Sequence, residues 1–195
     1  FNAGSAVAAD GSAGMAMLVT HISAATGALT WMAIEWIKSG KATMIGIATG
    51  MVAGLATITP ASGSVGPAGA LLIGFLAGLV CFYATQAIKS YFKIDDSLDV
   101  FPVHGVGGIL GIIMIAFVGN PDGFLGSGAA GISEDGAIAQ LMIQLQGVVV
   151  ISAYTALVTY VILRLISLIT DIRASEEDED IGLDMSEHNE QGYSL

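Results

Sequence analysis

Apolar residues run along this chain in long stretches that contain no Asp, Glu, Lys or Arg. The stretches are Gly11–Ile34, Ala42–Ile88, Val100–Pro121 and Gly136–Leu163. About 20 apolar residues cross the hydrocarbon core of a bilayer as an α-helix. The second stretch is too long for one crossing, and the segment TPASGSVGP at 59–67 divides it. The pattern therefore predicts five membrane helices, at 15–37, 42–59, 68–90, 101–119 and 137–170.

Composition agrees with this interpretation. Only 12% of the residues are charged and the mean hydropathy is +0.76, whereas soluble domains carry about a quarter charged residues. A membrane β-barrel would need segments of about ten residues with strict alternation, and the chain has none. The fold class predicted is therefore an all-α polytopic membrane protein.

The basic residues indicate an orientation. If the five helices alternate in direction, every Lys and Arg lies on one side of the membrane, at positions 38, 41, 89, 93, 164 and 173. Cytoplasmic loops carry an excess of Lys and Arg. We therefore expect the basic side and the C-terminus to be cytoplasmic, with the loops 60–67 and 120–136 outside.

The two ends of the chain differ from the apolar middle. FNAGSAVAAD at 1–10 reads as the last turns of another helix, so we expect the chain to be a piece of a longer protein. Residues 171–195 hold nine of the 17 acidic residues, and such a segment buries too little apolar area to fold alone. We expect a membrane domain at 1–171 and a cytoplasmic tail at 172–195. The acidic tail argues against binding to nucleic acid or to anionic lipid.

Small residues recur at helical spacing. Gly46, Gly50 and Gly54 follow one another at intervals of four, and pairs at the same interval occur at 74/78 and 107/111. Helices in lipid approach closely where small residues face each other. We interpret these glycines as packing positions.

His104 is the ionisable residue between Asp99 and Asp122 in an otherwise apolar run. An intramembrane histidine is a candidate for a pore or a bundle interior, because imidazole both donates and accepts hydrogen bonds. The alternative is a histidine bonded to a neighbouring helix. Asp99 is expected to cap the helix that carries His104. His21, in the first predicted helix, is expected to be a partnered structural histidine.

Four motifs resemble one known family. They are FNAGSA at Phe1–Ala6, TPASGSVGPAGAL at Thr59–Leu71, DDSLDVFPVHGVGGILG at Asp95–Gly111 and GLDMSEHNEQGY at Gly182–Tyr193. In this order they resemble the ammonium transporter (Amt/Mep/Rh) family. The resemblance implies the second half of an inverted-repeat, eleven-helix transporter, from the end of the sixth helix to the C-terminus. The pore of such a transporter forms between its two halves.

The resemblance also implies a role for single residues near the pore. His104 matches the second of two paired pore histidines, and Phe1 matches one of two stacked phenylalanines at the outer mouth. Ser5 matches a hydroxyl that helps to hold the cation in the outer vestibule. Val100 and Thr59 match positions on the pore wall, although a Thr before Pro also serves to end a helix and to bond a freed carbonyl.

The function implied is transport of ammonium or ammonia through a histidine-lined apolar pore. Because an ion in a narrow apolar channel is costly, a cation that loses a proton would pass at a much lower cost as ammonia. The sequence leaves both ammonia and ammonium open as the transported species. The resemblance further implies a homotrimer in the cell membrane (inner or plasma) and a PII-type regulator at the cytoplasmic face. Gly182, Leu183 and Asp184 match a tail element that packs on a neighbouring subunit. We expect no enzymatic activity, cofactor or metal; the alternative function is an ammonium sensor that signals through its tail.

Overall fold

The computed structural model describes residues 1–119 and 135–191, and these residues contain helices and turns but no β-strand. They form two compact units, 1–148 and 149–195, which are described separately. The helices of the first unit are η1 (Gly4–Ala6), α1 (Gly11–Ser39), α2 (Met44–Ile58), α3 (Pro67–Gln86), η2 (Ala87–Tyr91), η3 (Phe101–Val106), α4 (Gly107–Met114) and η4 (Ile115–Gly119). Helix α5 (Ala137–Ile166) crosses the boundary, and α6 (Glu176–Ile181) and α7 (Leu183–Ser186) follow.

The predicted spans are found as helices, and one of them is shorter than predicted. Four segments of the described chain are long and apolar enough to cross a membrane: Gly11–Ser39, Pro67–Tyr91, Phe101–Gly119 and Ala137–Ile166. The last is the longest, as predicted. Helix α2 has 15 residues, which cover about 22 Å and fall short of a core about 30 Å thick. The Thr43 side chain caps its start, and the chain leaves the helix just before Pro60.

Of the predicted end of another helix at residues 1–9, the structure shows one 3₁₀ turn, η1. Asp10 does not end a helix but begins α1, because its carboxylate accepts hydrogen bonds from the Ser12 and Ala13 amides at 3.0 and 3.2 Å. A short side chain with an acceptor oxygen at this position accepts hydrogen bonds from the first amides of the helix, which have no partner within the helix.

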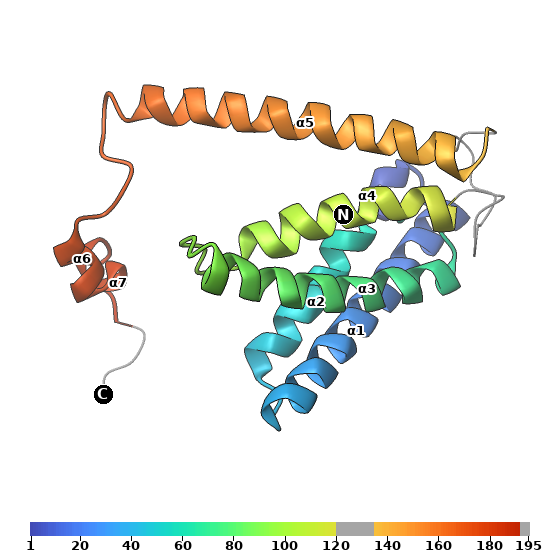
Figure 1. Cartoon of the computed structure of the whole chain (residues 1–195), viewed down its shortest axis with the longest axis horizontal. Helices are drawn as coiled ribbons and strands as arrows, with labels where there is room; N and C mark the ends of the chain where they lie inside the picture. Colours follow the sequence, from blue (N-terminus) through green and yellow to red (C-terminus); the bar gives the residue numbers. More distant parts are fainter. Residues whose placement is uncertain (120–134, 192–195) are drawn as a thin grey trace. The chain divides into compact units, whose positions relative to one another are not determined.

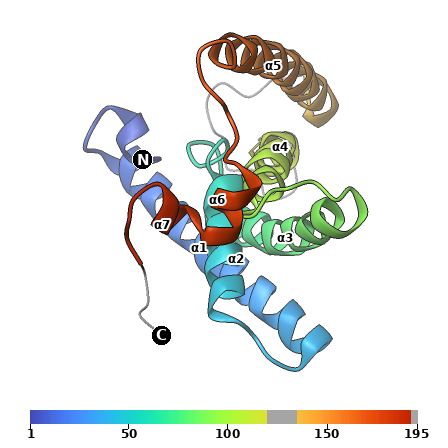
Figure 2. The same ribbon diagram turned by 90° about the vertical axis from the view of Figure 1, so that its left-hand side faces the viewer.

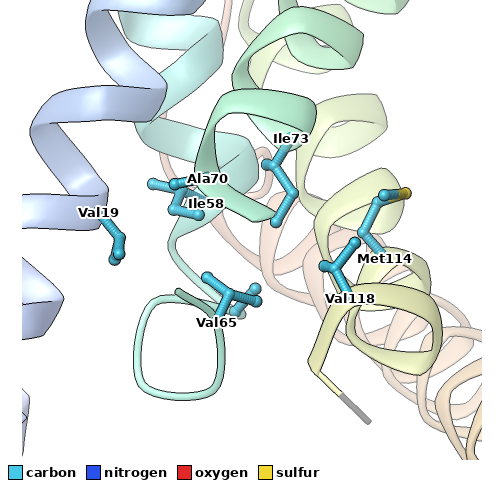
Figure 3. Packing of buried hydrophobic residues seen from close by; sticks show 8 residues of the cluster. Val19, Ile58, Val65, Ala70, Ile73, Met114 and Val118 are labelled. Atoms are coloured by element: carbon cyan, nitrogen blue, oxygen red, sulfur yellow. The ribbon is translucent and has the colours of Figure 1, made fainter. Parts of the chain in front are cut away.

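Helices α1 to α4 pack as one bundle in the first unit, in which α2 contacts α1, α3, η3 and α4 (Figures 1 and 2). Two clusters of buried apolar side chains hold the bundle. The cluster in Figure 3 consists of Val19, Ile58, Ala61, Val65, Ala70, Ile73, Met114 and Val118. The other consists of Trp31, Ala53, Ala77, Cys81, Phe82 and Val103. Through Val103, this second cluster reaches the helix that carries His104.

The glycine positions predicted from their spacing are packing positions, as expected. A Cβ atom on Gly54 or Gly74 would collide with the Ser23 carbonyl oxygen, so α2 and α3 both approach the α1 backbone at this point. The Ser23 hydroxyl is buried there and donates a hydrogen bond to the Gly54 carbonyl oxygen at 2.9 Å. A Cβ atom on Gly111 would collide with the Thr57 carbonyl oxygen, which brings α4 against α2.

The second unit contains the end of α5 and two short helices. The Ser175 hydroxyl caps α6 by accepting a hydrogen bond from the Asp178 amide at 3.1 Å. Arg173 lies 3.0 Å from a carboxylate oxygen of Glu179 and ties the segment before α6 to that helix. The acidic tail is therefore helical at 176–186. The predicted outer loop at 120–136 and the end of the last motif, 192–193, lie outside the described residues apart from 135 and 136.

Candidate functional site

His104 lies on η3, a π-helical turn that leads directly into α4, and its side chain is exposed. It lines two hollows in the surface of the first unit, with volumes of about 540 and 250 Å³. The larger is lined by Phe1, Asn2, Thr20, Val52, Leu55, Ala56, Thr59 and His104. The smaller is lined by Ile45, Ala48, Thr49, Val52, Leu98, Val103 and His104. His104 and Val52 are thus common to both hollows.

The start of η3 is set by a carboxylate, but not by the one predicted. The Asp96 carboxylate accepts hydrogen bonds from the Val100 and Phe101 amides, both at 2.8 Å. The predicted cap by Asp99 is wrong: its backbone is left-handed (φ 57°), and its carboxylate lies 2.8 Å from the Lys89 ammonium group. Pro102 follows in the first turn, where a missing N–H costs nothing because that amide has no partner in the helix.

The residues matched to the outer pore lie at different distances from the hollows. Phe1 and Thr59 line the larger hollow. The Thr59 hydroxyl donates a hydrogen bond to the Leu55 carbonyl oxygen at 2.7 Å, which is also the helix-ending role expected of a Thr before Pro. Ser5 donates to the Phe1 carbonyl oxygen at 3.1 Å and lines neither hollow. Val100 is 52% exposed and also lines neither.

Sequence reasoning missed the contribution of α2. Three of its residues line the larger hollow, at positions 52, 55 and 56, just before the predicted Thr59. Their spacing of three and four places them on one helix face, so the pattern was present in the sequence without a polar group to mark it. Reasoning also missed Asn2, whose side-chain amide donates a hydrogen bond to the Thr20 hydroxyl at 3.0 Å. This bond ties the first residues to α1.

The polar groups in the two hollows are uncharged apart from the titratable imidazole. Among the described residues, no Asp, Glu, Lys or Arg lines either hollow. The hydroxyls of Thr20, Thr49 and Thr59 donate to carbonyl oxygens of their own helices, at 2.6, 2.9 and 2.7 Å. The His104 ring has no hydrogen-bond partner in the described part of the chain and can offer a donor and an acceptor to a small molecule.

His21 differs from His104 in its surroundings. Its Nδ1 lies 3.1 Å from the Met17 carbonyl oxygen of the same helix, and its ring is exposed. It lines neither hollow. The expected partner is present, but it belongs to α1 itself and not to a neighbouring helix.

The matched tail residues lie at the junction of α6 and α7. Gly182 has φ 97° and ψ 129°, a conformation open to glycine and strained for other residues. Its amide donates to the Asp178 carbonyl oxygen at 2.9 Å and ends α6. Leu183 begins α7 and is 46% exposed. The Asp184 carbonyl oxygen accepts from the Glu190 amide at 2.9 Å, so the turn after α7 folds back on this junction.

Known proteins resemble this chain over its whole length. The profile of the Ammonium Transporter Family matches residues 1–193. The chain is 41% identical over 195 residues to an ammonium transporter of Aquifex aeolicus and 42% identical over 195 residues to Ammonium transporter Amt1 of Archaeoglobus fulgidus. These matches cover all of this chain but only 45% and 48% of those relatives. The chain thus spans about half the length of these relatives.

Solved structures give the same result. A structure titled "Sensor Amt Protein" matches 95% of this chain with a TM-score of 0.83 and 26% identity, over 44% of its own length. Mep2 of Saccharomyces cerevisiae matches 86% with a TM-score of 0.74 and 35% identity, over 40% of its length.

Proposed function

The chain belongs to the ammonium transporter family, and on this premise we propose that residues 1–195 form one wall of a pore through which ammonium or ammonia crosses a membrane. Transport, and not an enzymatic reaction, is the activity by which the family is named. The wall consists of the exposed faces of α2 and η3, with the larger hollow on one side of His104 and the smaller on the other.

The observation that supports this proposal most directly is the place of His104 between the two hollows. A molecule that moved along this wall from one hollow to the other would pass the imidazole and Val52, because both residues line both hollows. The passage would be mostly apolar, and the hydrogen-bonding side chain shared by both hollows would be a histidine.

The chemistry of the hollows favours a neutral molecule in transit. Neither hollow has an acidic side chain among the described residues to offset the cost of removing a cation from water. An ammonium ion that leaves its proton behind becomes a small neutral molecule, which is far less costly to move through an apolar passage. Neutral imidazole can accept one of its hydrogen bonds and donate another.

The test is His104→Ala in the full natural chain that contains these residues, reconstituted in vesicles. Ammonium-driven flux should fall about ten-fold or more, whereas protein yield and assembly should not change, because His104 is exposed and has no hydrogen bond in the described structure. His21→Ala is the matched control, since it removes a second exposed histidine of the membrane helices that lines neither hollow. Equal flux in the two variants would contradict the proposal.

A second candidate function is sensing, and one observation favours it. The match with a TM-score of 0.83 is to a structure titled "Sensor Amt Protein". In that case the tail would report ammonium binding in the membrane unit. A variant that lacks residues 172–195 would then keep transport and lose an ammonium-dependent response in the cell, and a transport-dead His104→Ala protein would keep the response.

We also infer the assembly and its regulation from family membership. The chain would act in a homotrimer in the cell membrane, with its C-terminus in the cytoplasm. The junction at Gly182, Leu183 and Asp184 would contact a neighbouring subunit and help to dock a PII-type regulator. Deletion of 182–195 should weaken co-purification of such a regulator. Unchanged regulator binding and unchanged transport would remove this part of the proposal.

A further inference from the structure

The segment between α3 and the helix of His104 is closed by an ion pair. Helix α3 continues as the π-helical turn η2, which carries Lys89, and ten residues after Lys89 the chain reaches Asp99, just before η3. The Lys89 Nζ lies 2.8 Å from the Asp99 Oδ1. The Asp99 side chain is 16% exposed and that of Lys89 is 42% exposed. The carboxylate is therefore largely removed from water and its partner is a single ammonium group.

The backbone at this ion pair is strained. Asp99 has φ 57° and Lys93, within the same segment, has φ 52°. The left-handed backbone conformation costs free energy for residues other than glycine. It persists where contacts with the surrounding structure hold it. At Asp99 the surrounding structure consists of the ion pair with Lys89 and the nearby Asp96 carboxylate, which accepts from the next two amides, those of Val100 and Phe101.

Asp99 is connected to His104 through the backbone of one turn. The Asp99 carbonyl oxygen accepts the hydrogen bond of the Val103 amide at 3.0 Å. Val103 is the residue before His104 and is 2% exposed. The residue before Asp99, Leu98, lines the smaller hollow together with His104. A change in the direction of the chain at Asp99 would therefore displace Leu98 and His104 relative to the α2 residues that also line that hollow.

We propose that the Lys89–Asp99 ion pair is a positioning element for the pore: it holds Asp99, just before η3, in its left-handed conformation and so fixes the direction in which the His104 ring faces the two hollows. Neither residue lines a hollow, so the ion pair acts through η3 and not by contact with the transported molecule. This inference rests on the proposed function only for its transport readout.

The first measurement does not depend on transport. A thiol is introduced by His104→Cys in a Cys81→Ala background, in the full natural chain, and its rate of modification by a small neutral methanethiosulfonate is followed in membranes. Lys89→Gln should change that rate by about ten-fold or more, since a displacement near 1 Å at a reacting group can change a rate by about 100-fold. Lys93→Gln is the matched control: it removes the same charge from the same segment, and Lys93 has no ion pair in the described structure. It should leave the rate within about two-fold.

A double-mutant cycle separates the ion pair from the backbone. Asn tolerates the left-handed conformation almost as well as Asp, so Asp99→Asn removes the charge and keeps the turn. Lys89→Gln, Asp99→Asn and the double variant should all change the modification rate and the ammonium flux by the same factor. A melting temperature that falls while both rates stay at the wild-type value would assign the pair a purely structural role and overturn the inference.

The two proposals fail in different ways. If His104→Ala keeps full flux, the proposed function is wrong, but the thiol measurement still decides whether Lys89 and Asp99 set the direction of residue 104. If His104→Ala abolishes flux and the Lys89→Gln and Lys93→Gln variants have equal rates of flux and modification, the ion pair does not position the histidine.

Discussion

The close approach of α4 to α2 makes Gly111→Ala the most informative packing variant. A Cβ atom on Gly111 would collide with the Thr57 carbonyl oxygen and lie 2.9 Å from the Pro60 Cγ. The colliding atom is backbone, so it cannot rotate away and the two helices must separate. Overpacking of this kind costs about 1–3 kcal/mol, and the better helix propensity of Ala returns at most about 1 kcal/mol. We expect a net loss of about 2 kcal/mol.

The consequence should reach the pore, because α4 continues directly from η3 and a shift of α4 carries His104 with it. The assay is thermal unfolding of the full natural chain in detergent, followed by flux in vesicles. A loss of about 2 kcal/mol would lower the melting temperature by about 4–8 °C in a chain of about 200 residues, and by less in the longer natural chain. Gly14→Ala is the control, since a Cβ atom there meets nothing within 4 Å. Equal melting temperatures for the two variants would refute the collision argument.

Two further variants test other contacts of the chain. Ser23→Ala removes the buried hydrogen bond to Gly54 and should lower the melting temperature slightly, by the equivalent of about 0.6–1 kcal/mol; an unchanged value would mean that the bond is not made in the membrane. Gly182→Ala places a side chain at φ 97° and 2.8 Å from an Asp184 carboxylate oxygen. It should speed amide exchange at 176–190 without changing the membrane helices. Equal exchange in the wild-type and variant proteins would argue against strain from a side chain at position 182.

The helices were predictable from the sequence because a bilayer demands them. Long runs without charged residues are typical of membrane helices, and the predicted positions of these helices agree with those in the structure. The length of α2 was not predictable, because its start depends on a contact across eight residues: the Glu35 carboxylate accepts from the Thr43 amide at 2.7 Å and from its hydroxyl at 3.1 and 3.2 Å. A carboxylate from the preceding helix thus completes the cap, and no local pattern reports such a contact.

The start of η3 shows a second limit of sequence reasoning. Both Asp96 and Asp99 precede the motif FPVHG, and both residue types cap helices. Which of them does so depends on the left-handed backbone at Asp99, which points that carboxylate toward Lys89. The choice is made by a residue ten positions earlier in the chain, on another helix. His104 itself could be singled out, because a titratable group in an apolar run is rare for energetic reasons.

His104 and its neighbour Val103 explain how a histidine can be fixed in place and still remain available. A pore group whose donor and acceptor were both occupied by the protein could not exchange hydrogen bonds with a passing molecule. The ring must therefore be held by something other than its own hydrogen bonds. Val103 is buried in a cluster with Trp31 and Phe82, and the η3 backbone is fixed at its start by Asp96. Adjacent helix residues face different directions, so the burial of the Val103 side chain turns the His104 ring toward the hollows. Apolar packing and helix capping hold η3 in place, and the imidazole keeps its donor and acceptor free.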